Sequence, residues 1–230
     1  VVGGAVIATV RRGAVATVDN VRALTKLPVA QDVAPPLDAG TMLPVPGLPP
    51  VVTPATDFFL IDTALIKPTV DVADWKLSIG GRVSSPYSVT YADLMDMPQI
   101  SRYVTLTCVS NEVGGELVGN ALWQGVRLRD ILDRADVRPD GVMITSESVD
   151  GFTTAFPLAY LNDVDDAMIA VGMNGAPLPV NHGFPARLVI PGLYGYVSAT
   201  KWLKEIRLTA VGDEVPFWIA RGWLAEGDIV

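Results

Sequence analysis

Apolar and hydroxyl-bearing residues alternate at the start of the segment 102–120, which reads RYVTLTCVSNEVGGELVGN. Val104, Leu106 and Cys108 fall on one side of an extended chain, and a tyrosine and two threonines fall on the other, as in a half-buried strand. The pattern predicts a strand that carries the only cysteine to its apolar face. Asn111 and neighbouring glycines follow and favour a turn that lets a ligand or another backbone come close.

Two interpretations of Cys108 stay open at this point. Free cysteine behaves as a small hydrophobe and is among the most buried residue types, so packing alone accounts for it, and periodicity by itself favours that interpretation. A thiol at the end of a strand, beside a permissive loop, is also well placed to hold a ligand.

The rest of the chain alternates short strands with few helices. Residues 75–81 alternate as a strand; Thr90 is expected to cap a short helix that Pro98 stops; and an i, i+3, i+4, i+7 apolar stripe from Leu128 to Ala135 predicts a helix of about three turns. Further strands are predicted at 142–149, 151–156, 168–171, 186–190 and 202–208, with turns at Asp150-Gly151 and Asn174-Gly175. This pattern indicates an α+β domain with a mixed sheet.

Composition excludes several classes of protein. The chain has 230 residues, half of them apolar, which is enough for a large core in one or two domains. A net charge of −8 with 17 Lys and Arg argues against nucleic-acid binding. One cysteine and one histidine exclude an intrachain disulfide and a zinc site built only from such residues. A thiolate can still bind a metal whose other ligands come from an organic cofactor.

Residues 1–56 are predicted to form an extended, proline-rich leader, and the domain proper begins near Asp57. Residues 1–10 are apolar and precede two arginines, but ten residues are too few to cross a bilayer, which needs about 20. This stretch is either the end of a longer membrane segment or a loosely packed leader.

Three other groups have residue types suited to binding. His182 is a hydrogen-bond donor or an ordinary structural histidine, and Asp150 is an acceptor or simply the first residue of a turn. Residues 192–201 combine glycines and hydroxyls with Lys201, as a phosphate site requires, although a tyrosine corner with a solvated lysine has the same pattern.

Longer stretches carry a resemblance. TLTCVSN, LWQGVRLRDIL and VGMNGAPLPVNHGFPARLVIPGLYGYVSATKWLKEI resemble, in order and spacing, the molybdopterin-binding domain of the sulfite oxidase family, over roughly 58–208. The chain is especially similar to the actinobacterial membrane-associated branch. The resemblance implies a sulfite-oxidase-type mixed-sheet fold over 57–210, a single molybdopterin, and Cys108 as the thiolate ligand of molybdenum.

The resemblance also implies the other cofactor contacts. They are Phe59, Asp62, Thr63, Asn111, Asp150, His182, Arg187, Ser198, Ala199, Thr200 and Lys201. Basic groups among them suit phosphate or pterin acceptors, and Asp150 suits pterin N–H groups.

Two departures bear on the substrate. Sulfite oxidases carry an arginine where this chain has Ile61, and a tyrosine near the metal where it has Val171. Losing a cation and a hydroxyl weakens binding of a small dianion, so sulfite is not the expected substrate.

Three hypotheses follow: a molybdenum oxidoreductase that transfers an oxygen atom to or from a small molecule, a sulfoxide reductase of the methionine sulfoxide reductase type, and a non-catalytic binding module. No CxxCH haem motif is present, so electrons are expected to pass to a separate partner or to another part of the full protein. Residues 211–230, with Trp218, Arg221 and Trp223, are interpreted as a lead into an immunoglobulin-like domain that forms a homodimer. The expected location is the cell envelope, outside the cytoplasm, with a membrane anchor in the full-length protein.

Overall fold

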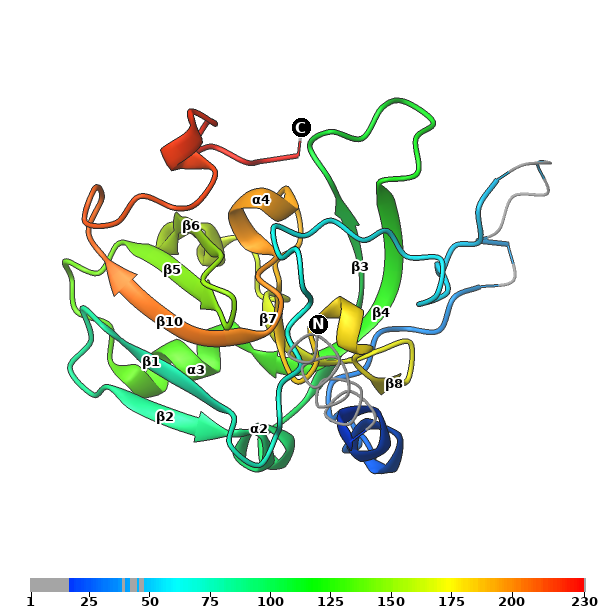
Figure 1. Cartoon of the computed structure of the whole chain (residues 1–230), viewed down its shortest axis with the longest axis horizontal. Helices are drawn as coiled ribbons and strands as arrows, with labels where there is room; N and C mark the ends of the chain where they lie inside the picture. Colours follow the sequence, from blue (N-terminus) through cyan, green and yellow to red (C-terminus); the bar gives the residue numbers. More distant parts are fainter. Residues whose placement is uncertain (1–16, 39, 42–44, 46–47, 230) are drawn as a thin grey trace, which may run out of the picture.

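Two β-sheets form the body of the protein in the computed structural model, which describes residues 17–38, 40–41, 45 and 48–229 (Figure 1). The first sheet has the order β2-β1-β10-β5-β6, in which β1 and β10 run parallel and the other pairs antiparallel. Its strands are β1 (Lys76–Gly81), β2 (Tyr87–Thr90), β5 (Met143–Ser148), β6 (Thr153–Pro157) and β10 (Leu203–Thr209). The predicted mixed sheet is therefore confirmed.

The second sheet is antiparallel, with the order β3-β4-β7-β8 and with β9 paired to β7. Its strands are β3 (Ile100–Thr107), β4 (Val118–Arg127), β7 (Met168–Met173), β8 (Ala176–Pro177) and β9 (Arg187–Val189). Asn174 and Gly175 both have positive φ, as the predicted two-residue turn between β7 and β8 requires. In Figure 1, β3 and β4 stand as a long hairpin on the side of the molecule away from β2.

Short helices connect these strands. They are α2 (Tyr91–Asp96), α3 (Leu128–Ala135) and α4 (Gly195–Ser198), with 3-10 turns η1 (Leu158–Asn162), η2 (Val180–His182) and η3 (Ile219–Arg221). The predicted cap of α2 is confirmed, since Asp93 N donates to Thr90 Oγ1 and Thr90 N donates to the Asp93 carboxylate. The apolar stripe of α3 is buried as expected, but the helix has eight residues, about two turns rather than three. It stops because Asp136 adopts a left-handed conformation.

The longest strand was not predicted from the sequence pattern. β4 is ten residues long, and its glycines interrupt the apolar alternation on which a strand prediction depends. The structure explains two of these glycines: a Cβ at Gly119 would lie 2.6 Å from a Phe58 ring carbon, and one at Gly125 would lie 2.1 Å from the Ile169 carbonyl oxygen. Any other side chain would clash with these neighbours, so close packing requires glycine at both positions.

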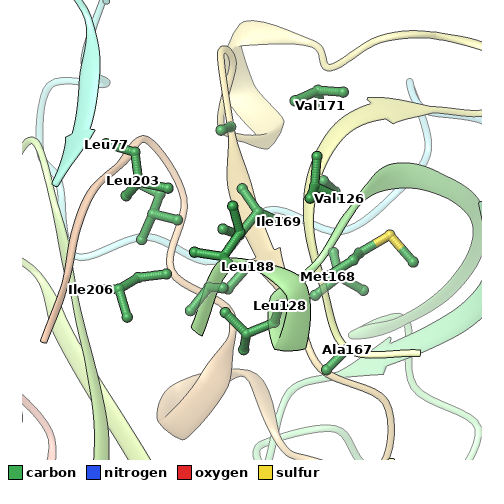
Figure 2. Close-up of a cluster of buried hydrophobic side chains, with 14 of the residues drawn as sticks. Leu77, Val126, Leu128, Ala167, Met168, Ile169, Val171, Leu188, Leu203 and Ile206 are labelled. Atoms are coloured by element: carbon green, nitrogen blue, oxygen red, sulfur yellow. The ribbon is translucent and has the colours of Figure 1, made fainter. Parts of the chain in front are cut away.

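The core joins the two sheets. Figure 2 shows buried side chains contributed by strands of both sheets and by α3. The labelled residues are Leu77, Val126, Leu128, Ala167, Met168, Ile169, Val171, Leu188, Leu203 and Ile206. Because the sheets share this cluster, their strand ends are held in fixed relation to each other.

The leader is not extended throughout. Residues 17–24 are helical and Val18 is buried, which corrects the prediction for that segment. Residues 27–38 and 48–54 form no helix and, apart from a bridge between Asp32 and Ile100, no strand, and they bond to the second sheet: Gln124 Nε2 donates to Pro28 O at 2.7 Å, and Thr53 N donates to Asn120 O at 2.7 Å. The apolar stretch 1–10 lies outside the described residues. Among the residues that are described, no helix is long and apolar enough to span a membrane.

Candidate functional site

A cavity of about 290 Å³ opens where the end of β3, α4, the segment around residue 60 and the C-terminal tail meet. It brings together residues distant in sequence. Those predicted as site residues that line it are Phe59, Asp62, Thr63, Cys108, Asp150, His182, Arg187, Ala199 and Lys201. Figure 1 shows α4, the red C-terminal tail and the loop between β3 and β4 on the same side of the molecule.

Cys108 lies just beyond β3, with its backbone N donating to Leu117 O at 2.9 Å. Val104 and Leu106 before it are buried, whereas Cys108 is a free, half-buried thiol in the cavity wall. The interpretation of Cys108 as an inert packed hydrophobe is therefore wrong. A half-exposed thiol in a cavity is accessible to a metal.

Arg187, in β9, is the main cation of the cavity. It is 5% exposed, its Nη1 donates to His182 O at 3.2 Å, and its Cζ lies 4.9 Å from the centre of the Trp123 ring. Within the described part of the chain, no carboxylate forms an ion pair with it. Burial lowers the pKa of Arg187 to about 10, because a charge removed from water is disfavoured, and the nearby Asp62 carboxylate only partly opposes this.

Lys201 is the second cation. Its ammonium pairs with Asp62, donates to Asn181 O at 3.2 Å and lies 4.8 Å from the centre of the Trp202 ring. Burial lowers the pKa of Lys201 to about 8 despite the opposing effect of Asp62. Gly183 has φ +106, and a Cβ there would lie 3.0 Å from Lys201 Cβ, so glycine is needed for this close approach.

His182 is neutral at pH 7, because burial lowers its pKa to about 4. Its Nε2 lies 2.8 Å from Ala55 O, and since a carbonyl only accepts, Nε2 carries the proton and Nδ1 is left as an acceptor. A neutral ring whose N–H is already used does not serve as a donor to phosphate. This geometry leaves Nδ1 of His182 available to accept a hydrogen bond, and its contact with a cofactor stays a prediction.

Three predicted residues do not line the cavity. Asn111 Oδ1 accepts from Leu117 N at 2.8 Å and fixes the loop after the cysteine, and Ser198 Oγ donates to Tyr194 O at 3.0 Å. Thr200 is buried in a triangle of hydroxyls with Ser146 and Thr154, at 2.7 to 3.0 Å. These side chains position the segments that carry Cys108, Ala199 and Lys201; any contact of theirs with a cofactor stays a prediction.

Asp150 lies at the predicted turn after β5, where its Oδ1 accepts from Phe152 N at 3.2 Å. Phe59 stacks on Phe58, with ring centres 5.2 Å apart and 18° between the planes. Asp150 retains a carboxylate acceptor for a ligand, and Phe59 supplies a flat apolar wall.

Sequence reasoning missed the contribution of the tail. Trp218, Trp223 and Tyr196 line the cavity, as does Phe152. The sequence pattern predicts that the two tryptophans lead into another domain, and no periodicity marks them as part of a site. The aromatic richness shared by residues 194–196 and 217–223 was the available signal.

The residues present fit an anionic, sulfur-coordinated cofactor. A buried guanidinium that forms no ion pair with a carboxylate in the described chain and a lysine with a lowered pKa both gain from a phosphate. A thiol on the same cavity supplies a soft ligand for a metal, and Asp150 and His182 supply acceptors. The donor set matches a phosphorylated, metal-bearing pterin.

Comparisons with known proteins agree with this interpretation of the cavity. Residues 64–216 match the family described as "Oxidoreductase molybdopterin binding domain". The chain is 32% identical over 181 residues to the "Uncharacterized oxidoreductase YuiH" of Bacillus subtilis, covering 79% of this chain and 88% of that protein. It is 33% identical over 160 residues to a nitrate reductase [NADPH] of Fusarium oxysporum, covering 60% of this chain and 18% of the relative.

The mitochondrial sulfite oxidase of Drosophila melanogaster is 30% identical over 172 residues, covering 65% of this chain and 30% of the relative. Among solved structures, the sulfane dehydrogenase SoxCD of Paracoccus pantotrophus superposes with a TM-score of 0.64 at 28% identity, covering 71% of this chain and 45% of the other. This chain thus spans less than a third of the nitrate reductase and the sulfite oxidase.

These findings define a molybdopterin-type oxidoreductase fold and site. The chain belongs to the oxidoreductase molybdopterin binding domain family, with molybdopterin as its cofactor. The predicted fold class, family, enzyme class and cofactor are confirmed.

Proposed function

We propose that this protein uses its molybdenum cofactor for two-electron oxygen-atom transfer on a small neutral substrate other than sulfite. The observation that carries the proposal is the charge of the cavity. Its lining contains two basic side chains that are charged at pH 7, Arg187 and Lys201, and the latter is already paired with Asp62. If the cofactor phosphate takes these cations, none in the lining is left for an anionic substrate.

The wall where a substrate cation is expected is apolar. Ile61, which replaces the arginine of sulfite oxidases, lines the cavity and is 50% exposed, so it offers a hydrocarbon surface to any bound molecule. A dianion facing this surface loses water without gaining a charged hydrogen bond, each worth about 1.5 to 3 kcal/mol. The same reasoning disfavours nitrate, although less strongly because it carries one charge.

Val171 does not contribute to this argument. It is fully buried in the cluster of Figure 2 and does not line the cavity. The apolar replacement at that position is explained by core packing, so only Ile61 bears on the choice of substrate.

The side chains have distinct roles in the proposed enzyme. Cys108 binds the metal as a thiolate, and Arg187 and Lys201 hold the phosphate. Asp150 and the free Nδ1 of His182 accept hydrogen bonds from pterin N–H groups. When bound, the cofactor supplies a metal centre that changes by two electrons as the oxygen atom is transferred.

Sulfoxide reduction is the favoured form of this reaction. A sulfoxide accepts two electrons and two protons and gives a thioether and water, with the electrons supplied by a separate electron-transfer partner or another part of the full protein. A sulfoxide is neutral, which suits a cavity whose remaining walls include Ile61, Val109 and aromatic rings. The membrane anchor, the extracytoplasmic location and the homodimer formed by a following domain stay proposals that rest on the resemblance alone.

The experiment is a pair of measurements on the purified, cofactor-loaded protein. Elemental analysis should give about one molybdenum per chain, and Cys108→Ser should abolish it while Ser110→Ala, in the same wall, retains it. Steady-state assays with artificial electron donors and acceptors should give turnover with sulfoxides. Sulfite or nitrate turnover at about 10 per second, typical of enzymes, with none on sulfoxides would refute the proposal.

A further inference from the structure

The C-terminal tail forms one wall of the cavity. Phe217 N donates to Thr153 Oγ1 at 3.0 Å, and Ile229 N donates to Gly192 O at 2.9 Å, so the tail is fixed to the domain at both ends. Between these bonds, the half-buried rings of Trp218 and Trp223 line the cavity. Both lie beyond residue 216, where the match to the family ends.

This wall lies near the cysteine. Gly195 faces the backbone of Thr107, the residue before Cys108: a Cβ added at Gly195 would lie 3.9 Å from the Thr107 carbonyl oxygen. Next to Gly195, Tyr196 meets Trp223 edge to face, with ring centres 5.2 Å apart. The indoles of Trp223 and Trp218 then follow with centres 4.5 Å apart.

The two tail indoles also differ from the other tryptophans in hydrogen bonding. Each of the three other tryptophans donates its Nε1 proton to a backbone carbonyl at 2.8 to 3.1 Å: Trp75 to Leu203, Trp123 to Val104, and Trp202 to Val180. Among the described residues, nothing accepts from Nε1 of Trp218 or Trp223. Neither N–H group therefore has an acceptor in the described chain, which leaves both for water or a ligand oxygen.

We propose that Trp218 and Trp223 are the substrate-recognising wall of this enzyme and select a neutral sulfoxide that carries an aryl group. The indoles would stack on the aryl ring, while an indole N–H donates to the sulfoxide oxygen. Two neighbouring indoles, tilted by 37° to each other, with N–H donors but no cation fit a ligand with an aromatic ring and a polar neutral oxide. This inference rests on the proposed function and names the substrate class for the same cavity.

The test compares methyl phenyl sulfoxide with dimethyl sulfoxide on the loaded enzyme. An aromatic contact of ordinary strength predicts that Trp218→Ala and Trp223→Ala each raise KM for the phenyl substrate about 2- to 12-fold. The rise in KM for dimethyl sulfoxide should be smaller, because that substrate loses only the indole N–H hydrogen bond and no aryl contact, and molybdenum content should not change. Trp218→Phe should keep the aryl preference, because it keeps a ring. Leu224→Ala, an exposed tail residue outside the cavity, is the control and should match the wild type.

A second measurement does not depend on turnover. Titration with methyl phenyl sulfone and dimethyl sulfone, which stand in for the substrates, should show by ligand-observed NMR that the wild type prefers the phenyl compound and that both alanine variants lose this preference. No preference in the wild type, or equal binding by the variants, overturns the inference. If the phenyl preference is present but no sulfoxide is reduced, the wall is supported and the proposed reaction fails.

Discussion

Replacing Arg187 by methionine distinguishes a cofactor-binding cation from a structural one. Burial lowers the pKa of Arg187 from 12.5 to about 10. Since each tenfold change in a proton equilibrium is about 1.4 kcal/mol, keeping the guanidinium charged without its ligand costs on the order of 3 kcal/mol. The substitution removes this cost from the cofactor-free protein.

The substitution also removes favourable contacts. The hydrogen bond from Arg187 to His182 O is worth about 1 kcal/mol, and the contact with the Trp123 ring about 2 kcal/mol when desolvated. Losses and gain nearly cancel, so the free energy of unfolding of the cofactor-free variant should stay within about 1 kcal/mol of the wild type. A structural buried ion pair would instead lose about 3 to 5 kcal/mol.

The affinity for the cofactor, by contrast, should fall strongly in the same variant. Two charge-assisted hydrogen bonds to phosphate, at about 1.5 to 3 kcal/mol each, correspond to a loss of at least about 100-fold in affinity. Denaturant unfolding of the cofactor-free proteins and molybdenum content of the loaded ones measure the two effects.

A matched control is Arg102→Met. Arg102 pairs with Asp32 and Asp166 at 2.7 Å and does not line the cavity, so its loss should lower stability and leave molybdenum content unchanged. If Arg187→Met lowered stability by 3 kcal/mol or more and still bound molybdenum, the reasoning from its missing carboxylate would be refuted.

Three further outcomes are expected. Inorganic phosphate should raise the Tm of the cofactor-free protein more at pH 7.5 than at pH 9.5, because Lys201, with a pKa of about 8, loses its proton between these pH values. An equal rise in Tm at both pH values, or the same pH dependence of the rise in Lys201→Gln, would contradict this. The pKa of His182 is lowered to about 4, so the unfolded state takes up a proton that the folded state does not as pH falls from about 6.5 to 4. Up to about 3 kcal/mol of the free energy of unfolding should be lost over this pH range. If a His182→Asn variant lost stability with falling pH as steeply as the wild type, this explanation would be wrong. Gly125→Ala should cost at least about 2 kcal/mol in denaturant unfolding, since its Cβ would meet the Ile169 carbonyl, whereas Gly80→Ala meets nothing within 4 Å and should be nearly neutral; similar losses in both would refute the packing argument.

Local patterns predicted many of the elements. The alternation of residues 75–81, the Thr90 cap and the apolar stripe of α3 act between residues close in sequence, and each was found where it was predicted. β4 was missed because its glycines are explained only by Phe58 and the Ile169 backbone, which lie far away in sequence. A tertiary contact overrode the local signal.

The residues of the site show the same difference between what the sequence predicts and what the folded chain decides. Residue types and their resemblance to a known family were enough to select Cys108, Asp150, Arg187 and Lys201, and the structure brings all four to one cavity. The resemblance could not show that His182 is neutral with its N–H already used, or that Val171 lies in the core, because burial and partners depend on the folded chain.

The sequence by itself determined which functional groups are present: a single thiol, a few basic side chains, and Ile61 where sulfite oxidases have an arginine. Only the tertiary structure decided which of these groups share a cavity, which cation lacks a carboxylate, and that the tail brings two indoles to the same wall. The physical reason is that desolvation and proximity are properties of the packed chain, and residues more than 100 positions apart set them here.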